Sequence, residues 1–322
     1  MASKTLTAAT LEAATRPTFY FIGVTTGASS IRTVFPEWAK ALQLGDVEMV
    51  GIDLPVHAPN EQYRKVVSFL ASDELSLGAL VTTHKLDLFR AAGDLFDEVD
   101  PLATLMDEVS SISKRNGLLR AHAKDPISSG LAVDAILGSR SFADQPREVV
   151  LLGAGGSAIA IDWYLTRRER GADRPTKVTV TNRSPERLAT LRSVHHRSGA
   201  ETELVTVLAD RHGQNDVVLA AASAGAFVVN ATGLGKDAPG SPLTDAAKFP
   251  DGSIAWDLNY RGNLVFLDQA RAAATRGVQA LDGWVYFIHG WTQVIAEVFD
   301  VAIPTSGPEF DELSRIAELV RR

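Results

Sequence analysis

The most informative segment of this 322-residue chain is Val149-Val150-Leu151-Leu152-Gly153-Ala154-Gly155-Gly156-Ser157-Ala158. Its four apolar residues predict a short buried strand. The run after the glycines predicts a helix, because Ala158, Ile161 and Leu165 fall on one helical face. Gly153, Gly155 and Ala158 occupy the marked positions of the G-x-G-x-x-G/A fingerprint, which joins a strand to a helix in dinucleotide-binding domains.

Each marked position has a physical role. Gly153 permits the tight turn, Gly155 lets the backbone approach a pyrophosphate, and the small Ala158 lets the helix pack on its strand. Free amides and the positive dipole end at the helix start favour phosphate charge. The alternative is a glycine-rich turn that binds nothing. The strand before it and the helix after it favour a dinucleotide site.

The type of dinucleotide is indicated by the next strand. This strand, expected from Lys177, runs into Thr181-Asn182-Arg183-Ser184, and Arg187 follows one helical turn further. An NAD enzyme places a carboxylate at this strand end to bind the ribose hydroxyls, whereas here two guanidiniums and the Ser184 hydroxyl can bind a 2′-phosphate. The pattern favours NADP. Ser184 can equally cap a helix, and both interpretations can hold at once.

Composition limits the class of protein. A hydrophobic content of 45% and a charged content of 22% are ordinary for globular proteins, and the length suits two domains. A formal net charge of −7 disfavours nucleic acid as a partner. The chain has no cysteine, which suits a reducing compartment. We find no apolar segment long enough to span a membrane and interpret the residues up to Arg16 as a loose leader, so we expect a cytoplasmic monomer or homodimer.

The first half of the chain alternates strands with helices, which predicts an α/β fold with a mostly parallel sheet. Ligands of such sheets bind beyond the C-terminal strand ends, so the loops Gly23–Ser30 and Thr82–Lys85 should lie at one edge. Asn116-Gly117 predicts the turn of a hairpin over Val109–Ala121. The other expected elements are strands at Thr18–Ile22, Val47–Ile52 and Gly78–Val81, and helices through Phe35 and Leu42, over Glu61–Leu70, and through Leu131 and Ile136.

The second half predicts a doubly wound sheet. We therefore expect an N-terminal α/β substrate-binding domain over residues 17–127 and a Rossmann-type, doubly wound NADP-binding domain over residues 128–289. Helices within residues 290–322, the last over Phe310–Arg322, should pack back on the first domain, and Ser139–Arg147 should form a linker loop. The expected strands after the glycine turn are Lys177–Val180, Leu204–Leu208, Phe227–Asn230, Ile254–Asp257 and Val278–Leu281.

From about Phe19 to the C-terminal helices, the chain resembles the shikimate dehydrogenases. The motifs that carry the similarity are the glycine turn, Asn182-Arg183-Ser184 with Arg187, Asn230-Ala231-Thr232, Asp257 with Tyr260, and Asp282-Gly283. The resemblance implies NADP-dependent, reversible reduction of a ring ketone of the 3-dehydroshikimate type, as in aromatic amino acid biosynthesis. It implies cofactor contacts at residues 153–158 and at Asn182, Arg183, Ser184, Arg187, Asn230, Ala231, Thr232, Leu258 and Gly283.

The resemblance also implies a catalytic pair. Val81-Thr82-Thr83-His84-Lys85 is similar to the segment that carries the family's catalytic lysine, although one residue shorter, and Asp125 matches the catalytic aspartate. The chemistry agrees, because reduction of a carbonyl leaves a developing alkoxide that needs a proton donor or a nearby positive charge. We assign the proton to the pair. The alternative is a solvated loop lysine and a turn aspartate before Pro126.

Several substrate positions differ from the family pattern. The implied substrate contacts are Ser29, Thr82, Ser113, Tyr260 and Gln293. Ser29 matches the first of two carboxylate-binding serines, but Ile31 stands at the second. Family asparagines are replaced by Leu80, Ser113 and Ala123, and the family glutamine falls near Gly290, with Gln293 close by. Lys114 or Lys124 could replace lost contacts with charge.

These differences leave the substrate open among shikimate, quinate, aminoshikimate and another cyclitol. A non-catalytic dinucleotide or metabolite sensor is the alternative from another class, and the presence of both Lys85 and Asp125 disfavours it. The seven histidines show no spacing such as H-E-x-x-H, so we expect no metal. We interpret His195-His196 with His212 as a solvated face. His84 is interpreted as a structural strand-end histidine, or as a second group in proton transfer.

Overall fold

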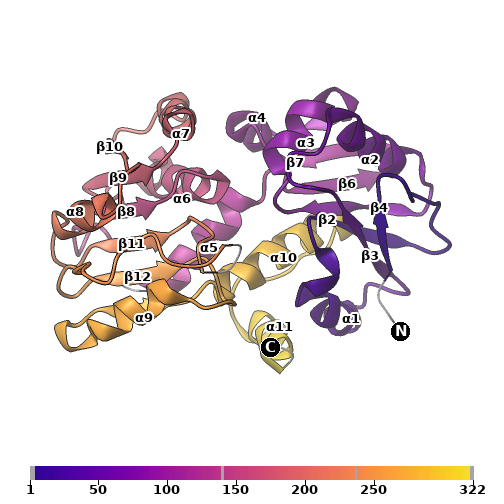
Figure 1. Ribbon diagram of the computed structural model, residues 1–322. Coiled ribbons are helices and arrows are strands. Elements are labelled where there is room, and N and C mark those ends of the chain that lie inside the picture. Colours follow the sequence, from indigo (N-terminus) through magenta and orange to yellow (C-terminus); the bar gives the residue numbers. More distant parts are fainter. Residues whose placement is uncertain (1–3, 139–140, 236–237, 320–322) are drawn as a thin grey trace. The chain divides into compact units, whose positions relative to one another are not determined.

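The computed structural model describes residues 4–138, 141–235 and 238–319 and divides into two compact units. The first unit takes its described residues from Met1–Lys124 and Ile288–Arg322, and the second from Asp125–Phe287. The sequence analysis placed the limits a few residues later, at 127 and at 289. Figure 1 shows the elements of both units, coloured along the chain.

In the described residues, the second unit has a parallel sheet of six strands in the order β10-β9-β8-β11-β12-β13 (Figure 1). Counted from β8, this is the order 3-2-1-4-5-6 of a doubly wound sheet, which confirms the predicted fold class. The order reverses between β8 and β11, so the glycine turn after β8 lies where such sheets bind ligands. The strands are β8 (Val149–Leu152), β9 (Lys177–Asn182), β10 (Glu203–Leu208), β11 (Phe227–Asn230), β12 (Ile254–Asp257) and β13 (Gln279–Leu281).

The first two helices of the second unit pack closely against each other. The helices of this unit are α5 (Asp125–Leu137), α6 (Gly156–Thr166), α7 (Pro185–Arg197), α8 (Gln214–Ala220), α9 (Val265–Ala272) and the start of α10 (Trp284–Phe299). A Cβ on Gly130 of α5 would lie 2.0 Å from the Tyr164 ring of α6, so only glycine permits this approach. The Tyr164 hydroxyl donates to Asp134 and ties the same two helices together.

The first unit has a sheet of seven described strands in the order β1-β3-β2-β4-β6-β7-β5. Strands β1 to β4 are parallel to one another, and β4 pairs antiparallel with β6. Strands β6 and β7 form an antiparallel hairpin, and β5 is parallel to β7. Asn116 and Gly117 both have positive φ, as a two-residue hairpin turn requires, which confirms the predicted hairpin. The strands are β1 (Thr5–Thr7), β2 (Thr18–Gly23), β3 (Glu48–Asp53), β4 (Ser76–Val81), β5 (Glu98–Val99), β6 (Ser111–Arg115) and β7 (Leu118–His122).

The C-terminal helices pack within the first unit. The Trp38 indole donates to the Leu313 carbonyl at 2.8 Å, and the rings of Phe19, Trp291 and Phe299 are in edge-to-face contact. These aromatic contacts bury the apolar face of the second part of α10 against β2. The helices of the first unit are α1 (Ile31–Ala41), α2 (Asn60–Ser72), α3 (Lys85–Ala92), α4 (Pro101–Met106), α10 from Ile288 onward, and α11 (Pro308–Leu319).

Two expectations about the first unit are wrong. The residues before Arg16 are not a loose leader, because Thr5–Thr7 pairs with β3 as an edge strand. Such a three-residue strand carries too little alternation to be visible in the sequence. Lys85 does not end a loop but is the first residue of helix α3. The polar residues before it gave no sign of a helix start in the sequence. Residues 139–140 of the expected linker and residues 320–322 of the expected last helix lie outside the described residues.

Candidate functional site

The glycine turn has the geometry that its sequence predicts. Gly153 has φ of 110°, and a Cβ there would lie 2.7 Å from the Ala231 carbonyl oxygen, so the position requires glycine. Gly155 precedes α6 as its N-cap, and a Cβ there would meet no atom within 4 Å. Ala158 is fully buried. The turn therefore leaves open space at Gly155, next to the amides that begin α6.

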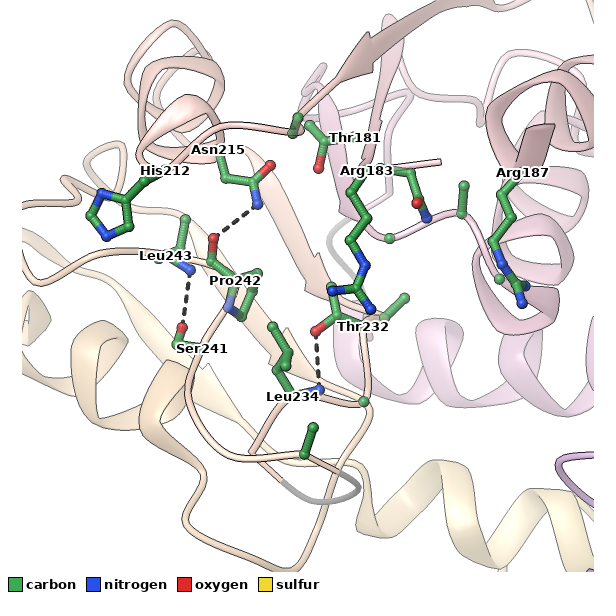
Figure 2. Close-up of a pocket in the computed structure, with 18 of the residues that line it drawn as sticks. Thr181, Arg183, Arg187, His212, Asn215, Thr232, Leu234, Ser241, Pro242 and Leu243 are labelled. Carbon is green, nitrogen blue, oxygen red and sulfur yellow. Dashed lines mark hydrogen bonds between the residues drawn. The ribbon is translucent and has the colours of Figure 1, made fainter. Parts of the chain in front are cut away.

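A cavity of about 590 Å³ lies beyond the C-terminal ends of β8, β9, β10 and β11 in the second unit. Figure 2 shows Arg183 and Arg187 together with Thr232 and Leu234 around it, and His212 on the side of β10. Of the residues predicted to bind the cofactor, those that line it are Gly153, Ala154, Gly155, Asn182, Arg183, Arg187, Ala231 and Thr232. The cavity thus brings together three motifs that are separated in the sequence.

The charge of the cavity favours a phosphorylated ligand. Arg183, Arg187 and Arg211 are among its described lining residues, and no carboxylate is. The sequence analysis missed Arg211 and His212. They follow β10, which pairs with β9, so the rule that parallel strands end at a common edge could have found them. Clustered guanidiniums without an acidic neighbour bind phosphate oxygens well.

Ser184 and Asn182 shape the turn at the end of β9. The Ser184 hydroxyl accepts from the Arg187 amide at 3.2 Å as the N-cap of α7, and it donates to Glu186 at 2.8 Å. This bond holds the pKa of the Glu186 carboxyl below its usual range. The Asn182 side chain accepts from the Ser184 amide at 2.9 Å. The capping interpretation of Ser184 is therefore confirmed.

Asn230 is buried and organises the turn after β11. Its side-chain oxygen accepts from the Thr232 amide at 3.1 Å and from the Thr232 hydroxyl at 2.7 Å, which positions the loop that lines the cavity. Next to it, burial raises the pKa of Asp257 to about 6, although the Asn259 amide donates to this carboxylate at 2.9 Å. Leu258 and Gly283 meet in the same region, where a Cβ on Gly283 would lie 2.0 Å from the Leu258 carbonyl oxygen.

Lys85 and Asp125 fall in different units, and each begins a helix. Lys85 is half-buried at the start of α3, where its amide donates to Thr82 at 3.3 Å and its carbonyl accepts from Val109 at 3.2 Å. Asp125 is buried at the start of α5, and its carboxylate accepts from the Tyr286 hydroxyl at 3.5 Å. The sequence analysis did not single out Tyr286.

His84 is a buried neighbour of Lys85. Its ring shares a hydrogen bond of 3.0 Å with the Tyr63 hydroxyl, and burial lowers the pKa of its imidazole. A buried ring in contact with a fixed tyrosine supports the structural interpretation of this histidine.

The replaced substrate positions of the first unit are occupied by internal contacts. Ile31 is fully buried. Ser113 lies 3.0 Å from the His122 ring, and Lys124 donates to Glu297 at 2.6 Å. The amine of Lys114 donates to the Asp73 carbonyl at 2.7 Å. The two lysines that could have supplied charge to a substrate are thus already engaged.

The remaining predicted substrate contacts lie in both units. Ser29 ends the short helical turn Thr26–Ala28 after β2, and the Thr82 hydroxyl donates to the Ile22 carbonyl at 3.2 Å. These two residues follow adjacent strands, which confirms that the two loops share one edge of the sheet. Gln293 is half-buried on α10 in the first unit. In the second unit, the Tyr260 ring packs on Trp284 and Phe287.

The interpretation of His195 as part of a solvated face is wrong. Its side chain is buried, with one ring nitrogen 2.9 Å from Asp162 and the other 3.1 Å from the Thr202 carbonyl. The periodicity of α7 does not reveal that Asp162 of α6 faces His195. His196 and His212 are exposed. The described residues contain no cluster of three or more potential metal ligands, and none of their helices is long and apolar enough to cross a membrane.

Comparison with known proteins gives consistent relatives, although no family model matches the sequence. A shikimate dehydrogenase (NADP(+)) from Methanothrix thermoacetophila is 28% identical over 224 residues, which cover 69% of this chain and 71% of that protein. A second, from Lactococcus lactis subsp. cremoris, is 26% identical over 165 residues, 51% of this chain and 54% of that protein.

Solved structures agree on the fold. Quinate dehydrogenase from Corynebacterium glutamicum in complex with NAD gives a TM-score of 0.72 at 22% identity, covering 94% of this chain and 98% of that one. Shikimate 5-dehydrogenase from Thermus thermophilus in complex with NADP(H) and shikimate gives 0.65 at 21% identity, covering 93% and 99%.

The parallel sheet in the order 3-2-1-4-5-6, the glycine turn at its switch point and the arginine-lined cavity define a Rossmann-type dinucleotide-binding protein with a second α/β unit. The motifs and the relatives narrow this class. The chain is similar in sequence to NADP-dependent shikimate dehydrogenases and shares its fold with shikimate and quinate dehydrogenases.

Proposed function

We propose that this protein is an NADP-dependent oxidoreductase that reversibly reduces a ring ketone of a shikimate-like cyclic hydroxy acid. The observation that carries the proposal is the cavity beside the glycine turn, which three arginines line. Relatives in both comparisons are named as NADP-dependent or were solved with NADP(H). This activity belongs to aromatic amino acid biosynthesis.

The residues of the second unit fit the cofactor. Gly155 leaves room for a pyrophosphate next to the amides of α6, and Arg183 and Arg187 would bind the 2′-phosphate. Bound NADP(H) supplies or accepts the hydride. Thr232 and the turn that Asn230 holds would form the wall of the site.

Lys85 and Asp125 would handle the proton of the reacting oxygen. An ammonium group stabilises the negative charge that develops on a ketone oxygen during reduction and can deliver the proton. A carboxylate can share this proton, so we assign the proton to the two groups together. In the reverse direction the same pair accepts the proton of the ring hydroxyl.

The substrate side supports a cyclic polyol whose contacts differ from those of shikimate itself. Ile31 offers no hydroxyl to a carboxylate, and Lys114 and Lys124 are engaged within the protein. A buried polar group of the substrate that finds no partner costs binding energy, so substrates with unmatched groups are rejected. Quinate, aminoshikimate and cyclitols without a carboxylate are therefore the alternatives.

The experiment is a panel assay with purified protein, NADP+ or NAD+, and shikimate, quinate, aminoshikimate and uncharged cyclitols, followed by nicotinamide absorbance. We expect turnover with NADP+ and one subset of the panel. Asp125→Asn should lower kcat by about 1,000-fold. Tight NADP binding without turnover of any substrate would favour the sensor alternative.

We also propose a cytoplasmic protein, because a chain without cysteine suits a reducing compartment. A monomer or a homodimer is proposed as its assembly. Fractionation of the native host and light scattering of the purified protein test these two statements.

A further inference from the structure

The Tyr286 hydroxyl links the starts of two helices in the second unit. It lies 3.5 Å from the Asp125 carboxylate at the first residue of α5 and 3.3 Å from the Ser157 hydroxyl at the second residue of α6. Asp125 is the proposed catalytic carboxylate, and Ser157 belongs to the turn proposed to bind the dinucleotide. The phenol therefore joins both parts of the proposed site within one unit.

The Tyr286 ring is held in place from its other side. It packs edge-to-face on Trp256, with 5.9 Å between ring centroids. Trp256 is fully buried in β12, and its indole donates to the Asp282 carbonyl at 3.2 Å. Because these contacts fix the ring, its hydroxyl is presented to Asp125 in one orientation.

The direction of the hydrogen bonds follows from the chemistry of the groups. The Tyr286 phenol has a single proton, so it can donate one hydrogen bond. An ionised carboxylate only accepts, so the phenol donates to Asp125, and the Ser157 hydroxyl donates to the phenol oxygen. Such a chain polarises along its length, which strengthens the bond to the carboxylate.

We propose that Tyr286 is a positioning residue, which orients the Asp125 carboxyl group for proton handling in the reaction. This inference rests on the proposed function of the Lys85–Asp125 pair. The separation of 3.5 Å is long for a hydrogen bond between a hydroxyl and a carboxylate. Hydrogen bonds in catalytic sites are often long before substrate binds and shorten in the complex.

A double-mutant cycle tests the proposal with the intact chain. Tyr286→Phe keeps the ring and its contact with Trp256 but removes the hydroxyl. We expect kcat to fall about tenfold, while KM for NADP+ stays within about twofold of the unmodified protein. Asp125→Asn should lower kcat by about 1,000-fold. The double variant should be no slower than Asp125→Asn alone, because Tyr286 acts only through that carboxylate.

Tyr164→Phe is the matched control. It also removes a tyrosine hydroxyl bonded to a carboxylate, Asp134, in the same unit, but near the far end of α6. We expect its kcat to be unchanged. A fall equal to that of Tyr286→Phe would indicate a general loss of rigidity and would overturn the positioning role.

The outcomes separate this inference from the proposed function. If Asp125→Asn is inactive but Tyr286→Phe keeps its kcat within about twofold, only the role of Tyr286 is wrong. Multiplicative losses in the double variant also overturn it, because they would show that the phenol acts independently of Asp125. If Asp125→Asn is fully active, the roles of Asp125 and of Tyr286 are both wrong, although the proposed reaction stands. If the unmodified protein turns over no substrate of the panel, the proposed function fails, and this inference fails with it.

Discussion

The two units use their polar side chains differently. In the second unit, Arg183, Arg187 and Thr232 line an open cavity. In the first unit, the polar side chains at the replaced substrate positions are bonded to other protein groups, as Lys124 is to Glu297 and Ser113 to His122. The open, arginine-lined cavity of the second unit therefore contrasts with internally bonded polar groups in the first.

The largest effect is expected from removing the proposed proton donor of the first unit. Lys85→Ala should lower kcat by about 1,000-fold, because the developing alkoxide loses both its positive charge and its proton source. NADP+ affinity, which depends on the second unit, should be unchanged in equilibrium titration. Lys40→Ala, which removes an exposed lysine paired with Glu37, is the control and should have normal kinetics. A near-normal kcat for Lys85→Ala would remove the lysine from the chemistry.

Stability in acid should separate the two units, because His289 in the first and Asp257 in the second are buried groups with shifted pKa values of opposite effect. In the first unit, burial lowers the pKa of His289, which stacks on Phe310, to about 4. Its contribution to stability is present above the unfolded value of 6.5 and is lost as the pH falls towards 4. The loss amounts to about 3 kcal/mol. His289→Phe should abolish this part of the pH dependence in calorimetric scans.

The stability contribution of Asp257 in the second unit should depend on pH in the opposite direction. Burial raises its pKa from 3.8 to about 6, so its contribution is present below 3.8 and is lost as the pH rises through 6. Above that pH, the ionised carboxylate costs up to about 3 kcal/mol. Asp257→Asn should therefore stabilise the protein at neutral pH and leave it unchanged in acid. A uniform shift at every pH would contradict the assignment.

A medium effect is expected from Glu297, the acidic residue of the first unit that bonds with Lys124 and Arg115. Burial opposes its ionisation, but the hydrogen bond from Lys124 and the surrounding positive charge hold the pKa of Glu297 below its usual range. Glu297→Gln removes the counter-charge of Lys124, whereas Arg115 keeps its ion pair with Asp300, and should lower the free energy of unfolding by about 2 kcal/mol. If unfolding is unchanged but KM for the substrate rises, Glu297 is part of the substrate site and the contrast between the units is weaker.

The smallest effect is expected on the preference for NADP+ over NAD+ when Arg187 is replaced. Arg187→Ala should raise KM for NADP+ about tenfold and leave KM for NAD+ unchanged, because only NADP+ carries the 2′-phosphate. Arg192→Ala removes an exposed arginine of the same helix that does not line the cavity, and serves as the control. Equal changes for both cofactors would assign Arg187 to general charge attraction.

The fold of the second unit could be predicted because its local signals are strong. The glycine turn has a unique steric requirement at Gly153, and the buried strands β8, β11 and β12 are short, mostly apolar runs. The edge strand β1 and the helix that begins at Lys85 were not predicted, because their sequences carry only weak periodicity. Contacts with other parts of the chain define these two elements.

The site was predicted less completely, because side-chain partners come from distant parts of the chain. The buried His195 bonds with Asp162, which is 33 residues away in the sequence, and Tyr286 is 161 residues away from its partner Asp125. Arg211 belongs to the cavity because β10 and β9 are neighbours. No spacing rule connects such residues, whereas the order of strands in the sheet does.

The close backbone contact between Gly153 and Ala231 limits how the sequence of this protein can evolve. A single methyl group on residue 153 would strike the backbone of the neighbouring loop at 2.7 Å, with no flexible atom there to yield. A substitution of Gly153 therefore requires a change in the loop at Ala231 as well. A descendant that kept glycine here would retain the option of binding a nucleotide even after its substrate chemistry had been lost.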